Sequence, residues 1–465
     1  MRRRAIIGSA VLITGCANEP AAPAPQLLPA IDAVTVNANT HNSLSAIVEM
    51  SVRRADSVAV RFHVGDMTTA LNSITPVVHT TGHAAVIPVL GLLPNSRYTM
   101  RAVAYGPGGS VIGDPLEFTT DTLPSDLPQY GVSGPDPSPG YVVFAVGQYG
   151  VAIDNTGRIV WYRRFPNGPG LNFMAQPNGR YVARPATLDP TDVEPWVELD
   201  PLGNVTRTLG CALDLQSRFH DLISEPDGAY WIMCDETRTM DLASVGGFAN
   251  ARVTGTAVQR IGAGGALLFH WTPFDHFAIT DLQPADLTGA TVNWTHGNAL
   301  DFAPDGNMIV SFRNLGEVTK INTSTGAVIW RMGGHRNQFT FVGSPVPAFS
   351  RQHGARAPAS GVLLLLDNLG DPGESRAERY VVDEAARTAL LSHSYGSIPG
   401  VVTQIGGSVQ SLPRGRTLVS FGTAGRVEEY DASGRVMWRI TGNAGYVFRA
   451  QRIMSLYSPG VETAR

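Results

Sequence analysis

Residues 303–332 read APDGNMIVSFRNLGEVTKINTSTGAVIWRM, and this stretch decides the fold. It contains two sequence patterns, which we call the first and the second form. APDGNMIVSF is a turn with glycine followed by an apolar run, whereas VTKINTSTGAVIWRM is two apolar runs joined by a polar turn with glycine. Asn or Asp with Gly at such a turn supplies positive φ angles, and the terminal Trp can fill the space between sheets. Together the two forms predict the four short strands of one small antiparallel sheet.

Both forms recur along the rest of the chain. The first recurs as QPNGRYVA (176–183), EPDGAYWIM (225–233), APASGVLLLL (357–366) and LPRGRTLVSF (412–421). The second recurs as VAIDNTGRIVWY (151–162), VELDPLGNVTRTL (197–209), VQRIGAGGALLFHW (258–271) and VEEYDASGRVMWRI (427–440), with a weaker copy, RYVVDEAARTALLSHSY (379–395), that lacks the glycine. Six such hairpins predict an all-β fold with a six-bladed β-propeller over residues 140–465.

The first unit of this repeat lacks an innermost strand. The C-terminal run YVFRAQRIMSLY (446–457) is apolar and strand-like. We expect it to complete the first blade and close the ring, because closure removes the exposed sheet edges that invite aggregation.

The N-terminal residues predict export. Three arginines precede a short apolar segment and the sequence ITGC, which ends at Cys16. The apolar segment is shorter than the roughly 20 residues that span a bilayer, so residues 1–15 are interpreted as a signal peptide. The ITGC pattern resembles a bacterial lipobox, which implies cleavage before Cys16 and its lipidation. The alternative is an ordinary signal peptide with an incidental cysteine. Ala17 after Cys16 favours an outer-membrane anchor, at the periplasmic or cell-surface side.

Two further modules precede the repeats. Residues 16–30 are rich in Ala and Pro and predict a tether. Residues 31–122 contain alternating apolar runs separated by turn residues, which predicts a small β-sandwich. Within it, LLPNSRYTMRAVAYG (92–106) resembles the late strands of fibronectin type III or Ig-like domains. Residues 123–139 hold five prolines and predict a linker.

Composition excludes some partners. The 465 residues carry a formal charge of -4, and Lys and Arg cluster only at residues 2–4, so no nucleic-acid partner is expected. Apart from Cys16, the cysteines are Cys211 and Cys234. In an exported chain they could form a disulfide, or they could be two buried thiols.

Three histidines occupy similar places in the repeat. His220, His296 and His353 each precede the turn of a first-form strand by a similar interval, the glycine of that turn falling at positions 228, 306 and 361. The first strand of a propeller blade lines the central channel, so we expect the three imidazoles to meet. Asn298, two residues after His296, should share its face, and Arg313 ends the next strand at the same mouth.

This constellation suits two kinds of chemistry. Guanidinium and N–H donors fit a sulfuryl or phosphoryl oxyanion, and a neutral imidazole is a competent nucleophile. Three histidines can instead hold a catalytic metal, although a nearby arginine opposes a cation.

The segments NWTHGNALDFAPDGNMIVSFRNLGEVTKINTSTGAVIWRMGG (293–334) and FSRQHGARAPASGVLLLLDN (349–368) resemble the signature regions of the bacterial arylsulfate sulfotransferase family. The resemblance implies transfer of sulfuryl from a phenolic sulfate to a phenol through a sulfated histidine, without a nucleotide sulfate donor and without a cofactor. It implies that His353 is the nucleophile and that His220, His296, Asn298 and Arg313 hold the sulfuryl oxygens.

The expected reaction is therefore a ping-pong transfer in which His220 or His296 protonates the leaving phenolate as a general acid. Small phenolic sulfate donors and phenol acceptors are the expected partners, and contact with a membrane is expected only through the lipid anchor. Two alternatives remain open: a metal-dependent propeller hydrolase or lyase, and a non-catalytic surface-anchored binding propeller.

Overall fold

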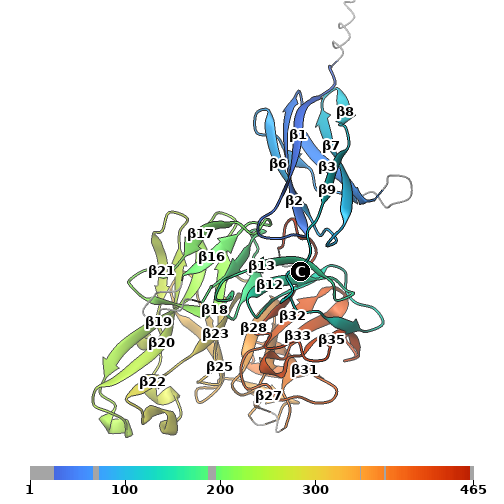
Figure 1. The fold of residues 1–465 in the computed structure, drawn as a ribbon. Helices are drawn as coiled ribbons and strands as arrows, with labels where there is room; N and C mark the ends of the chain where they lie inside the picture. The colour runs from blue at the N-terminus through green and yellow to red at the C-terminus, as the bar shows by residue number, and fades with distance from the viewer. Residues whose placement is uncertain (1–25, 66–72, 187–194, 346, 371–372, 461–465) are drawn as a thin grey trace, which may run out of the picture.

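The computed structural model describes residues 26–65, 73–186, 195–345, 347–370 and 373–460. Within these residues the chain forms 36 strands and six short 3₁₀ helices (Figure 1). The prediction of an all-β protein is confirmed. The described part contains no helix with the length and apolar character needed to cross a membrane. The predicted signal peptide and Cys16 lie outside the described residues.

The N-terminal residues form two packed sheets, drawn in blue to teal in Figure 1. The first sheet consists of β1 (Ala30–Ala38), β2 (Ser45–Arg53) and β6 (Ala84–Leu90). The second consists of β4 (Ser73–Ile74), β3 (Ser57–Val64), β7 (Arg97–Gly106) and β8 (Gly109–Ile112), with β5 (Val78–His79) and β9 (Leu116–Thr119) on β3 and β7. Alternate residues of β2 are buried, including Ala46, Val48 and Met50, because a strand turns every second side chain to the core.

The rest of the described chain forms six sheets of four or five strands, which are antiparallel except for one parallel strand pair in each of two sheets. The first sheet contains β11 (Tyr141–Val146), β12 (Tyr149–Ile153), β13 (Ile159–Arg164) and β36 (Ala450–Ile453), and the second contains β14 (Phe173–Ala175), β15 (Tyr181–Ala183), β16 (Trp196–Leu199) and β17 (Val205–Leu209). The third contains β18 (Gln216–Ser224), β19 (Tyr230–Met240), β20 (Ala251–Ile261), β21 (Leu267–Trp271) and β22 (Thr291–Asn293), and the fourth contains β23 (Gly297–Phe302), β24 (Met308–Phe312), β25 (Glu317–Ile321) and β26 (Val328–Gly333). The fifth contains β28 (His353–Ala359), β29 (Val362–Asp367), β30 (Arg376–Asp383), β31 (Thr388–Gly396) and β27 (Thr340–Val342), and the sixth contains β32 (Ser408–Leu412), β33 (Arg416–Ser420), β34 (Val427–Tyr430), β35 (Val436–Thr441) and β10 (Gly131–Ser133).

Six strands, one at an edge of each sheet, form the inner circuit of this body: β36, β14, β18, β23, β28 and β32. Neighbouring members contact one another at β14 and β36, β18 and β23, β23 and β28, β28 and β32, and β32 and β36. The remaining junction is closed by Asn172, which precedes β14 and donates to the carbonyl oxygens of Phe219 (2.7 Å) and His220 (2.6 Å) on β18. The six sheets are therefore arranged around one axis.

Tryptophans at the ends of the outer strands join one sheet to the next. The indole of Trp161 donates to the carbonyl oxygen of Pro201 at 2.8 Å, and that of Trp271 to Gly326 at 3.1 Å. Trp438 of the last sheet donates to Asn155 of the first at 3.2 Å. Each ring is almost fully buried, so the terminal Trp of the repeat fills the space between sheets, as predicted.

The hairpin turns explain why one repeat is weak. Five outer hairpins place a glycine in the left-handed region, for example Gly326 at φ 75° and Gly434 at φ 84°. In the hairpin between β30 and β31, Arg387 adopts φ 54° at the corresponding turn. A non-glycine residue can hold this conformation at a modest steric penalty, so the hairpin forms without its signature.

The C-terminal strand closes the circuit. β36 pairs with β11 in antiparallel register, Tyr141 opposite Ile453 and Phe144 opposite Ala450. The predicted completion of the first sheet is confirmed. In addition, β10, which lies in the segment predicted as a linker, pairs with β35 of the last sheet.

Short 3₁₀ helices lie outside the sheets: η1 (Ala243–Val245), η2 (Pro273–Asp275), η3 (Ile279–Asp281), η4 (Pro284–Leu287), η5 (Pro413–Gly415) and η6 (Gly422–Ala424).

The two N-terminal sheets contact the body of six sheets through hydrogen bonds. Asn39 donates to the Leu202 carbonyl oxygen at 2.8 Å, and the Leu90 N–H donates to the Tyr457 hydroxyl at 3.0 Å.

Candidate functional site

The three predicted histidines come together at one end of the inner circuit. His220 lies on β18, His296 directly precedes β23, and His353 begins β28. The ring centroids of His220 and His296 are 5.0 Å apart. Phe448, which precedes β36, packs against the rings of His220 and His353, and its ring centroid lies 5.7 Å from that of His220 and 6.1 Å from that of His353. His220 and His353 are buried and His296 is half-buried, so the cluster opens on the side of His296.

The surroundings of His353 define its protonation. Its Nδ1 lies 2.8 Å from Oδ1 of Asn368 and 3.0 Å from the carbonyl oxygen of Arg351. Both partners are acceptors, so Nδ1 carries the hydrogen. Nε2 then holds the lone pair, and the N–H of Gly406 points at it from 3.3 Å. The atom of His353 that faces away from its anchor is therefore unprotonated.

The other two imidazoles have different Nδ1 partners. Nε of Arg218 donates to Nδ1 of His220 at 3.3 Å, and Nδ2 of Asn293 lies 2.8 Å from Nδ1 of His296. His296 also has an unusual backbone, with φ 49°, and the pairing of β23 with β24 shifts register between Gly297 and Ala299. Regular strand alternation, which we used to place Asn298 on the face of His296, therefore does not apply at this point.

All three imidazoles are uncharged at neutral pH. Burial lowers the pKa of His353 to about 4, with Arg313 and Arg449 acting in the same direction against the hydrogen bond to Asn368. Burial and the charges of Arg218 and Arg313 lower the pKa of His296 to about 2. Burial, followed by Arg218, lowers the pKa of His220 well below its ordinary value. Guanidinium groups supply the positive charge at this site, and the imidazoles do not.

Arg313 lies at the mouth, as expected from sequence. Its N–H donates to the carbonyl oxygen of His296 at 3.0 Å. Its half-buried guanidinium donates to Oδ1 of Asn314 at 3.1 Å and to the carbonyl oxygen of Gln404 at 3.3 Å. Burial and the charge of Arg351, which also donates to Asn314, lower the pKa of Arg313. Two guanidinium groups therefore share one amide oxygen beside the histidines.

Asn298 is fully buried and faces a backbone partner. Its Nδ2 donates to the carbonyl oxygen of Gln352 at 2.7 Å, whereas its Oδ1 has no hydrogen-bond partner in the described structure. Gln352 immediately precedes His353, so Asn298 helps to fix the start of β28. The structure thus gives Asn298 a role in placing the strand that carries His353.

A buried ion pair lies beneath the cluster. Arg449 donates through Nη1 to Asp221 at 2.7 Å and through Nη2 to the carbonyl oxygen of Asn298 at 2.7 Å. Arg356 reaches the same carboxylate at 3.2 Å. Beyond this pair, towards the other ends of the inner strands, lies a cavity of about 350 Å³ lined by Asp221, Arg356 and Arg449 among others. None of the three histidines lines this cavity.

Sequence reasoning missed four of these groups: Arg218, Asp221, Asn368 and Arg449. Two of them had a signal, because RFHDL places Arg218 two residues before His220 and Asp221 directly after it. Asn368 directly follows β29, the strand paired with β28, and Arg449 lies 228 residues from its ion-pair partner, so neither is adjacent in sequence to the residue it contacts.

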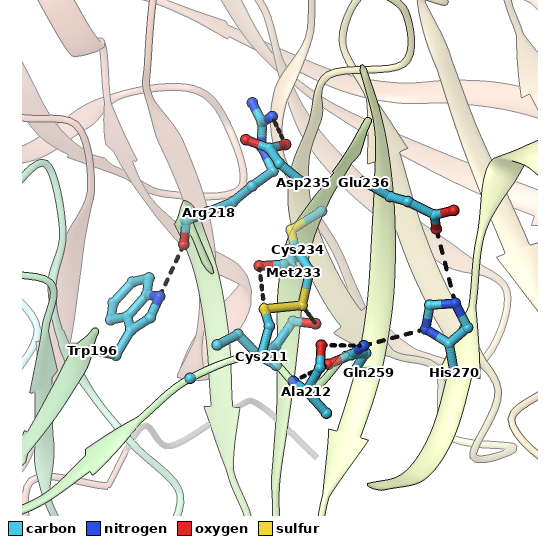
Figure 2. Close-up of a disulfide and its surroundings, with 12 residues drawn as sticks. Trp196, Cys211, Ala212, Arg218, Met233, Cys234, Asp235, Glu236, Gln259 and His270 are labelled. Atoms are coloured by element: carbon cyan, nitrogen blue, oxygen red, sulfur yellow. Dashed lines mark hydrogen bonds and ion pairs between the residues drawn. A yellow bond between two sulfur atoms is a disulfide. The ribbon is translucent and has the colours of Figure 1, made fainter. Parts of the chain in front are cut away.

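The two remaining cysteines form a disulfide (Figure 2). The sulfur atoms of Cys211 and Cys234 are bonded at 2.01 Å, across a separation of 23 residues. Cys234 lies on β19, and the next residue, Asp235, forms an ion pair with Arg218. Of the two alternatives from sequence, the structure has the disulfide.

Among the described residues, no group of three His, Cys, Asp or Glu side chains is arranged to hold a metal ion. Uncharged imidazoles beside guanidinium groups, one of them with a directed lone pair, form a site suited to nucleophilic group transfer at an oxyanion. The sequence profile of the Arylsulfotransferase (ASST) family matches residues 206–443, just over half of the chain. The chain belongs to this family.

Other comparisons are more distant. No curated protein sequence matches the chain significantly. A solved protein of unknown function from Bacteroides caccae is 12% identical, with 67% of this chain and 98% of that chain covered and a TM-score of 0.43. Virginiamycin B lyase from Staphylococcus aureus is 10% identical, with 67% and 83% covered and a TM-score of 0.35. Regucalcin from Agrobacterium tumefaciens is 14% identical, with 70% and 95% covered and a TM-score of 0.33. Scores this low support no conclusion about this chain.

Proposed function

We propose that this protein is an arylsulfate sulfotransferase that moves a sulfuryl group from a phenolic sulfate ester to a phenolic acceptor through a sulfated His353. One observation carries the proposal. His353 presents an unprotonated Nε2, with Asn368 and the Arg351 carbonyl oxygen holding its Nδ1, at a mouth that also contains His220, His296 and Arg313. Membership of the family supports the same chemistry.

In the first half-reaction, Nε2 of His353 attacks the sulfur of the donor. The sulfur–oxygen bond to the aryl group breaks, and its electron pair leaves with the phenolate oxygen. In the second half-reaction, the acceptor oxygen attacks the same sulfur and the electron pair returns to Nε2. Arg313 stabilises the charge on the sulfuryl oxygens, and N–H groups of His220 and His296 donate to them. Asn298 donates to the sulfuryl oxygens through the Nδ2 hydrogen that is not bonded to the carbonyl oxygen of Gln352.

The fold supports this assignment. We interpret the six sheets as the blades of a six-bladed β-propeller and the two N-terminal sheets as a fibronectin type III-like sandwich, the organisation predicted from the repeats. In this interpretation the histidines line the channel mouth of the third, fourth and fifth blades. Sequence reasoning places the propeller at 140–465, the sandwich at 31–122 and the linker at 123–139.

We also propose that the protein is an exported lipoprotein anchored through Cys16, periplasmic or at the cell surface. This rests on the ITGC pattern. Globomycin-sensitive processing of the full chain in a bacterial host, abolished in Cys16→Ala, would support it. A soluble mature product from the wild-type chain would exclude it.

The central test uses para-nitrophenyl sulfate as donor and phenol as acceptor. Wild type should release nitrophenol and form phenyl sulfate, and without acceptor it should gain the mass of one sulfuryl group on the peptide containing His353. His353→Ala should lose both while keeping its thermal unfolding curve. Activity that needs zinc or iron and is removed by a chelator would favour a metal-dependent hydrolase or lyase. Binding of aryl sulfates without turnover would favour a non-catalytic propeller.

A further inference from the structure

We propose that Arg218, held by Asp235, is a positioning residue that fixes His220 as a neutral Nε2–H donor, so that sulfuryl passes only between phenols acidic enough to leave and attack as phenolates. The proposal rests on the sulfotransferase function proposed above. It changes the role expected for His220 from general acid to hydrogen-bond donor, and it adds two residues to the site.

The inference rests on the contacts that Arg218 makes with His220 on its own strand and with Asp235 on the neighbouring strand. Arg218 and His220 are two residues apart on β18, and Nε of Arg218 donates to Nδ1 of His220. The Arg218 side chain is only 6% exposed, and its Nη1 forms an ion pair with the carboxylate of Asp235 on β19. Its carbonyl oxygen accepts the indole N–H of Trp196 at 2.9 Å. Figure 2 shows Arg218 held between Trp196 and Asp235.

This contact decides which nitrogen of His220 is protonated. A guanidinium group has only donors, so the nitrogen it faces must be the acceptor and Nδ1 carries no hydrogen. The hydrogen of the neutral ring is therefore on Nε2. The amide nitrogen of Asn293 imposes the same tautomer on His296. At His353, by contrast, two acceptors face Nδ1, and the lone pair is on Nε2.

The three imidazoles are thus sorted into one nucleophile and two donors by the groups at Nδ1. A neutral Nε2–H ring can donate a hydrogen bond, but it can give up its proton only by becoming an imidazolate. A second proton on His220 would be placed beside Arg218, with Arg449 nearby and His296 and His353 facing it. Positive charge at this position is strongly disfavoured.

The substrate class follows from this arrangement. When Nε2 of His353 bonds to sulfur, the aryl oxygen leaves with the electron pair and receives no proton from His220 or His296. It departs as a phenolate and is protonated by solvent. By microscopic reversibility the acceptor attacks as a phenolate, its proton already lost to solvent. Acidic phenols, such as those with electron-withdrawing substituents, should therefore be the best leaving groups, and alkyl sulfates should not be donors.

The test is a series of aryl sulfates whose phenols differ in pKa, measured with wild type, His220→Gln and His220→Ala. We expect kcat/KM of the wild type to fall steeply as the pKa of the leaving phenol rises. Loss of the donor in His220→Ala should lower kcat/KM by about 100-fold for every donor, with an unchanged slope. His220→Gln, whose amide N–H can replace Nε2–H, should recover part of the loss. A steeper slope in either variant would identify His220 as a general acid and overturn the proposal.

A double-mutant cycle tests Arg218. Arg218→Met should lower kcat about 10-fold or more in the wild-type chain, but less than about 2-fold in His220→Ala, because its effect passes through the ring. An equal loss in both backgrounds would mean that Arg218 contacts the sulfuryl group itself. Asp235→Asn should follow Arg218→Met with a smaller loss.

The tautomer can be observed directly. In protein labelled with ¹⁵N-histidine, the His220 signal, identified by its absence in His220→Gln, should be that of an Nε2–H ring. In Arg218→Met it should shift towards a mixture of tautomers while the His353 signal stays that of an Nδ1–H ring, whereas unfolding would release both rings. An Nδ1–H signal in wild type would overturn the proposal. If wild type turns over no aryl sulfate, the proposed function fails, whereas this measurement still reports on the tautomer.

Discussion

Oδ1 of Asn368 lies 2.8 Å from Nδ1 of His353, and the Nδ2 group of the same amide donates to two carbonyl oxygens, those of Thr403 at 2.9 Å and Gly406 at 3.0 Å. Both carbonyls accept only from an N–H group, so turning the amide over would break both bonds. The amide oxygen therefore stays directed at His353, and the hydrogen bonds of Asn368 fix the Nδ1–H tautomer of this ring.

Asn368→Ala should lower kcat/KM for para-nitrophenyl sulfate by about 10- to 100-fold, because the His353 ring loses the acceptor that fixes its tautomer and orientation. Steady-state kinetics at several donor concentrations would separate kcat from KM, and most of the loss should lie in kcat. Thermal unfolding would establish that the variant is folded. Unchanged kcat in a folded variant would mean that the Arg351 carbonyl oxygen alone positions the ring.

The pH dependence of the reaction should differ from that of an ordinary histidine. Protonation of Nε2 removes the nucleophile, so activity is lost as the pH falls through the pKa of His353. Burial lowers this pKa to about 4. We therefore expect kcat/KM for the donor, which reports the first half-reaction alone, to stay nearly constant down to about pH 5 and to fall below about pH 4, whereas a solvent-exposed histidine would titrate near 6.5.

This profile should be measured with an alkaline quench, so that the released phenol is read as phenolate at every pH. Recovery of full activity after return to neutral pH would separate titration from acid unfolding. Asn368→Asp provides a comparison, because a carboxylate at Nδ1 favours the imidazolium and should move the acid limb upward. An acid limb near 6.5 in wild type would contradict the burial of His353.

Much of the fold could be predicted because the repeat carries its own turn chemistry. Glycines such as Gly326 mark the outer hairpins, and tryptophans such as Trp271 mark the outer strands. The fifth hairpin was harder to recognise, since Arg387 takes the left-handed turn position without a glycine. A pattern search cannot anticipate a substitution that the backbone tolerates at a modest energetic penalty.

The site was partly predictable for the same reason. His220, His296 and His353 are in register with the repeat, so their meeting at one mouth could be anticipated. The groups that set their protonation could not, with the exception of Arg218, which lies in the same short motif. Asn368 and Arg449 reach the histidines from other strands, and only the assembled sheets show their distances.

The disulfide should contribute to stability mainly by restricting the unfolded chain. Cys211 and Cys234 enclose a separation of 23 residues, for which the chain-entropy estimate is about 3 kcal/mol. Replacing both cysteines with Ala should therefore lower the free energy of unfolding by about 3 kcal/mol, measured by urea denaturation. Wild type in reductant should approach the same value. Equal midpoints for wild type with and without reductant would show that the bond is absent in solution.

A buried charge network should contribute to ring closure. Glu429 is fully buried and binds two guanidinium groups, Arg416 at 3.0 Å and Arg452 of the closing strand at 2.8 Å, together with the hydroxyl of Ser138 at 2.6 Å. Removing one partner of a buried ion pair leaves the other charges uncompensated, at a cost of about 3–5 kcal/mol. Glu429→Ala should therefore lower the melting temperature markedly and increase aggregation, as the edge of β11 becomes exposed.

The matched control for this prediction is Asp32→Asn, which removes an ion pair with Arg53 on the surface of the N-terminal sheets. Both residues of that pair are exposed to solvent, so its loss should leave the melting temperature nearly unchanged. Differential scanning calorimetry and light scattering on the three proteins would provide the measurement. If Glu429→Ala has the same melting temperature as Asp32→Asn, β36 is held by its backbone pairing and packing alone. The network of Arg416, Glu429 and Arg452 then contributes little to closure.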